Sequence, residues 1–510
     1  MPYISGINRN QAQMFPEYLE DYIDEENPAR VIEAFIDALD IKKHQFTKSN
    51  PAGPGAPSFN PKDLLKLYIY GYMNSLRSSR KLEKATYNNI DVIWLMRKLH
   101  PDFKTIADFR KENKKQLKAI FKEFNLLCKD WGLFGGELVA VDGTKFRADN
   151  SKKNNYNKKK IDRQTKYIDE KIEGYLEELE NGDKEPDSKP KYTVEELKEK
   201  IEKQEKRKAF YNNLENELKK SGDNEISTID PDARIMDNKK NGLEVNYNVQ
   251  IAVDGRNSLI LAVDVTNKPS DQGHLNDMAQ AAKEALGLGA KEVLEVVADK
   301  GYYQADDLKK CNENGTVTYV THQTYSNGTG NPEYYSDKFR YDSEKDIYIC
   351  PQGENLYSAK HKKDDPERVR YKNYKACSSC PNKELCTKSG KGREINRSKD
   401  QDFLDIVDGK TEQNMDKYLK RQMIVEHPFG TVKRPMNAGY FLTRRLESVK
   451  AEANLTFLAY NIKRVINILG VKEIVSRIEA KIRHILLTMK NSYIFFYTIN
   501  SENNIAVFSI

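Results

Sequence analysis

The sequence predicts an α/β fold in which a mixed sheet is flanked by helices and follows an all-α N-terminal domain. Three observations predict it. Apolar runs at 138–141 and 293–298 are typical of buried strands. Residues 244–267 alternate apolar and polar side chains, as a β-hairpin does. Helical patterns precede these strands, and a Lys/Glu-rich stretch separates the first strand from the second.

The chain has 510 residues, enough for roughly two to four domains and at least one sizeable core. No run approaches the roughly 18 apolar residues of a membrane-spanning helix, and residues 1–26 lack a basic and then apolar signal pattern. We therefore expect a soluble, intracellular protein without a membrane partner. In that compartment its six cysteines would stay reduced.

The formal net charge of +7 is modest, but the basic residues are clustered. Residues 17–26 are acidic, whereas residues 415–465 are basic. Contact with a phosphate backbone requires such clustering, although a solvated helix face explains it equally well. The basic side chains of this stretch are Lys417, Lys420, Arg421, Lys433, Arg434, Arg444, Arg445, Lys450, Lys463 and Arg464.

Residues 27–130 have the pattern of short helices joined by tight turns. Pro28 and Pro61 stand where two helices begin, and apolar residues then recur on one face of each. Such helices are typical of a helix-turn-helix DNA reader and also of a plain docking domain. In a DNA reader, the candidate phosphate contacts would be Arg77, Arg80, Lys81, Arg110 and Lys111.

Residues 151–223 predict an antiparallel helical hairpin inserted into the sheet domain. Apolar residues of the first helix fall at 7-4-3-4 spacing, from Ile161 to Leu179. Thr193 and Glu196 form a capping box at the start of the second helix. The many charges are explained by solvation of exposed helix faces.

The predicted order of elements is strand, insertion, two strands, helix and strand. The two strands form the hairpin at 244–267, and the helix runs from 274 to 286. This order is the start of an RNase H-like sheet, in which the first and fourth strands are neighbours. His274 is expected at the start of the helix, in a structural role rather than in the site.

The first and fourth strands each end in an aspartate, Asp142 and Asp299. Neighbouring strands would bring these carboxylates together, and Mg²⁺ prefers oxygen ligands held on rigid elements. Asp-Gly endings also occur simply because these residues make turns, and Asp254-Gly255 repeats the pattern. Asp254 is the weaker candidate, because its turn lies at the other end of the sheet.

A cysteine cluster lies within residues 303–410, which predict a small β-rich insertion. The cluster offers four thiols with one CxxC pair, a candidate tetrahedral zinc site. The spacing after the pair is wider than in a regular zinc knuckle, so reduced packing cysteines explain the pattern equally well. The four residues are Cys350, Cys377, Cys380 and Cys386.

Residues 412–434 predict a helix that supplies a third acid, Glu426. On one face of an uninterrupted helix, Tyr418, either Arg421 or Gln422, and Lys433 would lie near it, and the tyrosine, arginine and lysine would hold phosphates. Pro428 is expected to kink this helix or to begin a new one, because it lacks an N–H. The alternative is that Glu426 is a surface residue beside a helix start.

Three motifs in this order resemble the bacterial insertion-sequence DDE transposases, in the group with a helical N-terminal domain and a strand-rich insert before the last acid. They are AVDGTKFRADNSK, VVADKGYY and YLKRQMIVEHPFGTVKR. FNPKDLLKLYIYGYMNSLRSSRKLE with PDFKTIADFRKEN resembles that group's helical leader. The sequence departs from that group's pattern at one point: four residues, rather than three, lie between Arg421 and Glu426.

The resemblance implies that Asp142, Asp299 and Glu426 are catalytic and hold two Mg²⁺ ions, with Mn²⁺ as a substitute. It implies cleavage of DNA at the terminal inverted repeats of the element, transfer of the ends into target DNA, and a homodimer in the synaptic complex. The expected location is the bacterial cytoplasm, associated with the nucleoid. The implied DNA-contacting residues are Arg77, Arg80, Lys81, Lys145, Arg147, Tyr418, Arg421, Lys433, Arg434, Arg444 and Arg445.

The expected domain boundaries follow from these patterns. Residues 1–130 form a helical DNA-binding or docking domain, and 131–302 the first part of an RNase H-like catalytic domain, with the hairpin insertion at 151–223. Residues 303–410 form the Cys-containing insertion, 411–470 the catalytic helix with the rest of the catalytic domain, and 471–510 a C-terminal tail.

Two other functions remain open from the sequence. An RNase H-like nuclease would cut DNA and never join it. A domesticated transposase would keep the fold and bind DNA without catalysis, but the three intact acids argue against that function.

Overall fold

The structure is a computed structural model that describes residues 18–49, 58–184, 192–238, 242–289, 291–322, 327–359, 368–484 and 487. The predicted tail is therefore described only to residue 487, and residues 491–510 lie outside the described residues. No described helix is long and apolar enough to cross a membrane.

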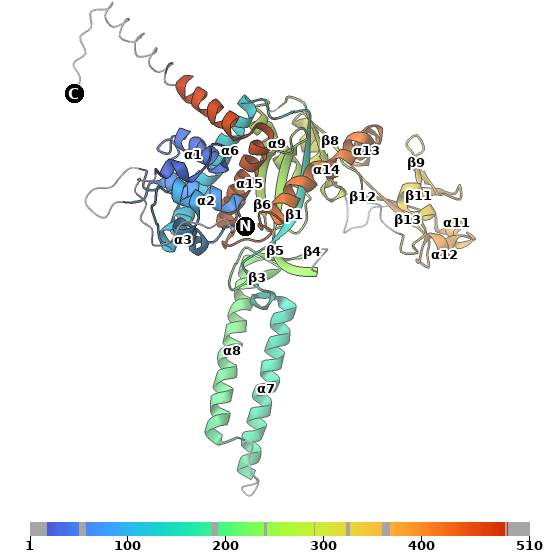
Figure 1. The fold of residues 1–510 in the computed structure, drawn as a ribbon. Coiled ribbons are helices and arrows are strands. Elements are labelled where there is room, and N and C mark those ends of the chain that lie inside the picture. The colour runs from blue at the N-terminus through green and yellow to red at the C-terminus, as the bar shows by residue number, and fades with distance from the viewer. Residues whose placement is uncertain are drawn as a thin grey trace, which may run out of the picture.

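A six-stranded mixed sheet forms the centre of the molecule, so the predicted mixed α/β fold class is confirmed (Figure 1). The strand order is β4-β5-β1-β7-β8, and β6 pairs with β5. β1 pairs parallel with β7 and antiparallel with β5, and β7 pairs parallel with β8. The strands are β1 (Leu138–Arg147), β4 (Arg234–Asn238), β5 (Gly242–Asp254), β6 (Ile260–Thr266), β7 (Leu294–Ala298) and β8 (Thr316–Tyr319).

Apolar cores cover both faces of this sheet. Alternate residues of a strand point to opposite faces, so Val139 and Val141 pack against α9 (Leu275–Leu286), while Ala140 faces the larger core formed with the C-terminal and N-terminal helices. Asp142 has the same parity as Ala140 and is therefore directed towards the face on which α14 (Met415–Lys433) packs. The alternation along β1 thus decides towards which face of the sheet the Asp142 side chain points.

The described residues between Pro28 and Asp130 form a series of helices, as predicted. Asn27 and Asn60 cap helices that begin with Pro28 and Pro61, and each asparagine accepts a hydrogen bond from the helix backbone. α15 (Leu446–Leu469) packs against α2, α6 and β6, and so joins the N-terminal helices to the sheet. The N-terminal helices are α1 (Pro28–Ala38), α2 (Pro61–Met73), α3 (Ser79–Asn88), α4 (Ile90–Leu95), α5 (Phe103–Glu112) and α6 (Lys114–Asp130).

Two long helices, α7 (Lys158–Lys184) and α8 (Val194–Ser221), form the predicted hairpin and project away from the sheet (Figure 1). Thr193 and Glu196 make the predicted capping box. The buried side chains at the base of the hairpin are Ile161, Leu214 and Leu218. Short strands β2 (Asn155–Asn157) and β3 (Glu225–Ser227) pair at this base and connect it to the body.

A separate five-stranded antiparallel sheet lies on another side of the body (Figure 1). Its core is small and contains five buried residues, Phe339, Tyr348, Leu356, Tyr371 and Ile395. The elements are β9 (Arg340–Asp342), β10 (Ile347–Ile349), β11 (Asn355–Ala359), β12 (Arg368–Lys372), β13 (Glu394–Ser398), α11 (Tyr374–Ser378) and α12 (Lys383–Cys386).

The chain then returns to the main sheet through α13 (Gln401–Gln413) and α14. α14 runs from Met415 to Lys433 with Pro428 inside it, so the alternative that a new helix begins at Pro428 is corrected. Proline costs the helix one hydrogen bond. Its buried side chain packs with Ile424, Val425, Phe429 and Val432 on the face that covers the sheet, and this packing keeps the helix continuous.

Candidate active site at the ends of β1 and β7

Asp142 and Asp299 lie side by side where the parallel pairing of β1 with β7 stops. The parallel register pairs Val141 with Ala298, and each of these residues is followed by its aspartate. The predicted neighbouring of the first and fourth strands is therefore confirmed. Gly143 N donates to Oδ1 of Asp142 at 2.9 Å, and Gly301 N donates to Oδ1 of Asp299 at 2.6 Å. These hydrogen bonds, one within β1 and one in the turn after β7, fix where each carboxylate lies.

The Asp142 carboxyl holds its proton more tightly than an ordinary aspartate does. Burial raises its pKa to about 7, the Arg421 guanidinium opposes this rise, and the negative charges of Asp299 and Asp271 add to it. The side chain is 22% exposed, so solvent reaches it from one side. The site therefore brings three carboxylates, Asp142, Asp299 and Asp271, near one another and near Arg421 and Lys145.

Arg421 faces the site from α14. Its Nη1 lies 4.0 Å from Oδ2 of Asp142. Its Nε is buried and has no hydrogen-bond partner among the described residues. The change in spacing before Glu426 therefore does not remove Arg421 from the aspartates.

Asp271 is a third acid that sequence reasoning missed. It follows β6 in the loop before α9, and Oδ1 of its carboxylate accepts from Asn248 at 2.7 Å and from Gln250 at 2.8 Å. Lys145 Nζ lies 3.5 Å from the same oxygen. The only sequence signal was the polar alternation of β5, which places Asn248 and Gln250 in an otherwise apolar strand.

Glu426 is on the same helix as Arg421 but on its exposed side. Its Oε1 accepts a hydrogen bond from Gln422 Nε2 at 2.7 Å. In the part of the chain that the structure describes, no three or more His, Cys, Asp or Glu side chains are arranged to hold a metal ion. The grouping of Glu426 with the two aspartates thus stays a prediction.

The remaining predicted residues of α14 also face the sheet. Lys433 Nζ donates to Thr144 Oγ1 at 2.5 Å, and the Tyr418 hydroxyl lies 2.9 Å from Thr321 Oγ1. Arg421 and Lys433 thus approach the same strand, β1. Arg421 lies near Asp142, and Lys433 contacts Thr144, two residues further along.

Arg77 corrects one expectation. It is 3% exposed and pairs with the fully buried Glu452 at 2.8 Å, and it also donates to the backbone oxygens of Asn437 and Tyr440. A guanidinium buried in the core and paired with a carboxylate is not available to DNA, so the predicted phosphate contact at Arg77 is wrong. Arg110 is likewise turned inwards and donates to the hydroxyl of Tyr72.

The other predicted DNA-contacting residues lie mostly on the surface. Arg444 pairs with Asp149 at 2.9 Å, which brings the chain after α14 next to the chain after β1. Arg80 lies over the ring of Phe103. The exposed basic side chains of the predicted set are Arg80, Lys81, Arg147, Arg434, Arg444 and Arg445.

The four cysteines of the small sheet line one cavity of about 30 Å³. Cys350 follows β10 in a turn closed by Gly353 N on Cys350 O, and Cys380 N bonds to Cys377 O. Burial raises the pKa of Cys386 to about 11, and the other three thiols lie close enough to add to the rise. All four are free thiols in the structure.

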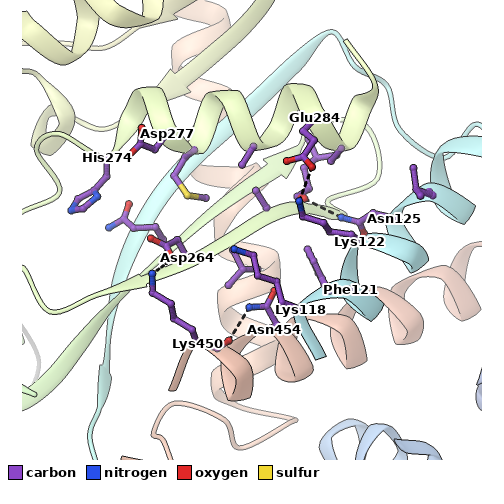
Figure 2. A pocket seen from close by; sticks show the side chains of 18 residues that line it. Lys118, Phe121, Lys122, Asn125, Asp264, His274, Asp277, Glu284, Lys450 and Asn454 are labelled. Atoms are coloured by element: carbon purple, nitrogen blue, oxygen red, sulfur yellow. Dashed lines mark hydrogen bonds and ion pairs between the residues drawn. The ribbon is translucent and has the colours of Figure 1, made fainter. Parts of the chain in front are cut away.

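A larger cavity of about 440 Å³ lies between α6, β6, α9 and α15 (Figure 2). Ion pairs of Lys122 with Glu284 and Lys450 with Asp264 lie at its edges. His274 lines it at the start of α9, as predicted, and burial lowers the pKa of its ring. None of the predicted catalytic acids lines this cavity.

Asp254 has a structural role at the opposite end of β1. Its register partner is Val139, and its carboxylate accepts hydrogen bonds from Gly135 N and Gly136 N at 3.0 Å and from Arg256 N. The carboxylate therefore holds the hairpin turn against the chain that leads into β1.

Comparison with known families gives two matches. A family described as "Transposase domain (DUF772)" matches residues 17–112, and a family described as "Transposase DDE domain" matches residues 349–466. The second match includes Glu426, Arg421 and the four cysteines, whereas Asp142 and Asp299 lie between the two matches. No curated protein and no solved structure matches the chain. The two family matches support an insertion-sequence DDE transposase.

Proposed function

We propose that the chain cleaves DNA at the ends of an insertion sequence and joins those ends to target DNA. The observation that carries the proposal is the parallel pairing of β1 with β7, which sets Asp142 beside Asp299 with Arg421 and Lys145 around them. The strand order supports an RNase H-like catalytic domain. The proposed domain boundaries are those expected from the sequence.

The aspartates fit a divalent cation by the chemistry of their oxygens and because the pairing of β1 with β7 sets them side by side. Asp142 and Asp299 would hold the cation, and Glu426 would join them once its carboxylate gave up the hydrogen bond from Gln422 and turned towards the aspartates. Mg²⁺, or Mn²⁺ in its place, would supply activation of the attacking oxygen and stabilisation of the leaving one.

The chain's own cations would act on the DNA. Arg421 offers a fork of donors that matches a phosphate, and Lys433 is a compact charge beside Thr144. Because both come from α14 and reach β1, they would hold the scissile phosphate over Asp142. The exposed arginines after α14 and β1 would extend this contact along the backbone of the DNA, and a homodimer would bring two ends together.

The decisive experiment incubates the purified full-length protein with its own flanking DNA ends and Mg²⁺, and maps the product ends. Cleavage followed by joining to a target supports the proposal. Cleavage without joining indicates the nuclease, and binding without cleavage indicates the catalytically silent DNA-binding protein.

Lys433→Ala is expected to weaken DNA binding for all sequences alike. Loss of one phosphate contact should reduce the slope of log K against log salt by about 0.9. The measurement is fluorescence anisotropy of a labelled DNA end between 50 and 200 mM salt, roughly the range over which such contacts dominate. Lys122→Ala, which removes an exposed lysine paired with Glu284, is the control and should keep the slope. An unchanged slope for Lys433→Ala would remove Lys433 from the DNA contact.

We further propose that the cysteine cluster holds structural zinc. Four thiols surround one small cavity, and Nε of the nearby Arg393 is buried without a hydrogen-bond partner among the described residues, as a donor facing thiolates would be. The small core of this sheet also leaves a need for a cross-link. The sulfurs do not converge as placed, so binding would require their side chains to turn inwards.

Metal analysis of the purified protein is expected to give about one zinc per chain, as a four-thiolate site holds one ion. Cys377→Ser should lose it, because three thiolates bind more weakly. Cys311→Ala removes a buried cysteine outside the cluster and should retain it. Wild-type protein without bound metal, and with four reactive thiols in the cluster, would contradict the zinc site.

A further inference from the structure

Asp271 lies in the loop after β6, where its carboxylate contacts side chains of β5 and β1. Its Oδ1 takes hydrogen bonds from Asn248 and Gln250 of β5 and is the ion-pair partner of Lys145 on β1. These contacts all come from residues embedded in the sheet. Asn248 and Gln250 are both fully buried, so the acid is held by a rigid cradle.

The cradle is tied to the turn that carries Asp299. Gln250 donates to Asp271 through Nε2 and accepts a hydrogen bond from the hydroxyl of Tyr302 through Oε1. Tyr302 is fully buried and belongs to the single turn that follows Asp299. Movement of Asp271 would therefore disturb both the lysine on β1 and the turn after β7.

Two glycines leave room for this acid. A Cβ on Gly143 would lie 2.6 Å from Oδ1 of Asp271, and a Cβ on Gly301 would lie 3.5 Å from its Oδ2. Gly143 directly follows Asp142, and Gly301 stands two residues after Asp299. The absence of side chains here brings the Asp271 carboxylate close to the strand ends that carry the other two acids.

Lys145 is the group on which this arrangement acts. Its side chain is 17% exposed, and its ammonium is attracted by Asp271, Asp142 and Asp299. Asp271 is the acid in ion-pair contact with it. Without the Asp271 charge, the ammonium would be drawn to Asp142 and Asp299, whose oxygens the proposed reaction needs.

We infer that Asp271 is a positioning residue, which holds the Lys145 ammonium beside Asp142 and Asp299 without letting it occupy their carboxylates. The inference rests on the proposed function of this site. It assigns Asp271 no contact with DNA, so its effect passes through Lys145 and should disappear when Lys145 is absent.

A double-mutant cycle on the full-length protein tests this coupling. The four proteins are wild type, Asp271→Asn, Lys145→Ala and the double variant. Asparagine keeps the shape and the acceptor oxygen that Asn248 and Gln250 use, and it removes only the charge. Asp264→Asn is the matched control, because Asp264 pairs with Lys450 at 2.8 Å on the neighbouring strand β6 and should leave cleavage unchanged.

Asp271→Asn is expected to lower kcat for end cleavage by about 10- to 100-fold, the range seen when a supporting contact of an active site is removed. KM for the DNA end should change little, because Asp271 does not bind DNA. The double variant should be no slower than Lys145→Ala alone, since the two residues act as one unit.

Multiplicative losses in the double variant would overturn the inference, because they would show that Asp271 acts independently of Lys145. A fall in thermal stability that accounts for the whole loss of activity would overturn it as well. If the wild type does not cleave its own ends, the proposed function fails separately. Thermal unfolding of the same four proteins then reports the coupling, because the ion pair of Asp271 with Lys145 is present with or without cleavage, and additive losses of stability would overturn it.

Discussion

Asp142→Asn is expected to abolish DNA cleavage, with a loss of more than about 10²-fold, because even supporting contacts around such sites cost up to that amount. The substitution removes a carboxylate oxygen from Asp142 on β1, where the parallel register sets it beside Asp299. The hydrogen bond from Gly143 N can still be accepted by the amide oxygen. The geometry of the strand at this position should therefore survive while the charge is lost.

The measurement is cleavage of a labelled element end at saturating Mg²⁺, with DNA affinity and thermal unfolding followed in parallel. The thermal stability should not fall, because burial disfavours the ionised carboxyl that the substitution removes, as its raised pKa indicates. Asp264→Asn serves as the control at a solvent-accessible acid. Retention of cleavage by Asp142→Asn would exclude Asp142 from the chemistry and with it the proposed function.

Arg77→Ala is expected to produce a large loss of stability, about 3–5 kcal/mol, the usual cost of breaking a buried ion pair by removing one partner. Glu452, left behind, is fully buried on α15. Its carboxylate also accepts from Leu442 N, Thr443 N and Thr443 Oγ1, so the pair fixes the chain between α14 and α15. That chain carries Arg444 and Arg445, which links the stability of this pair to the predicted DNA surface.

The free energy of unfolding of Arg77→Ala can be measured by urea denaturation near pH 7. Arg80→Ala removes an exposed arginine three residues away and is expected to change stability by less than about 0.5 kcal/mol, as surface substitutions do. A loss below about 1 kcal/mol for Arg77→Ala would contradict the buried pair, since exposed pairs contribute no more than that.

The same pair makes a further contribution that depends on pH. Burial alone would raise the pKa of Glu452, but Arg110, Arg77 and the hydrogen bonds from Thr443 and Leu442 hold it below its ordinary value. A carboxyl whose pKa is lower in the folded state stabilises the fold at pH values above its unfolded pKa. This contribution is lost as the pH falls through the folded pKa. Wild-type stability should therefore fall on acidification below the ordinary range of a glutamate more steeply than that of Arg77→Ala.

Local sequence patterns were sufficient for the strands and for two of the acids. The apolar run before Asp142 is buried in β1, and the run before Asp299 forms β7, because burial of both faces of a central strand requires continuous apolar residues. The order of elements also predicted that these strands are neighbours, as the register confirms. The capping box at Thr193 followed from side-chain chemistry within four residues.

The environments of charged residues could not be predicted in this way. Arg77 resembles a surface arginine in sequence, yet its partner Glu452 is 375 residues away. Asp271 resembles a turn residue, and its role depends on Asn248, Gln250 and Lys145, which come from two other strands. Glu426 was selected by its motif, but the orientation of α14 turns it to the exposed side with Gln422.

The sequence by itself determined the two aspartates at the strand ends, the helical hairpin and the transposase resemblance, because each is encoded in local apolar periodicity, capping or a short motif. Only the tertiary structure decided which cations face those aspartates, that Asp271 joins them, and that Arg77 is withdrawn into the core. The physical reason is that strand pairing and helix packing fix the distance between charges that lie far apart along the chain, and electrostatic interaction depends on that distance and on burial.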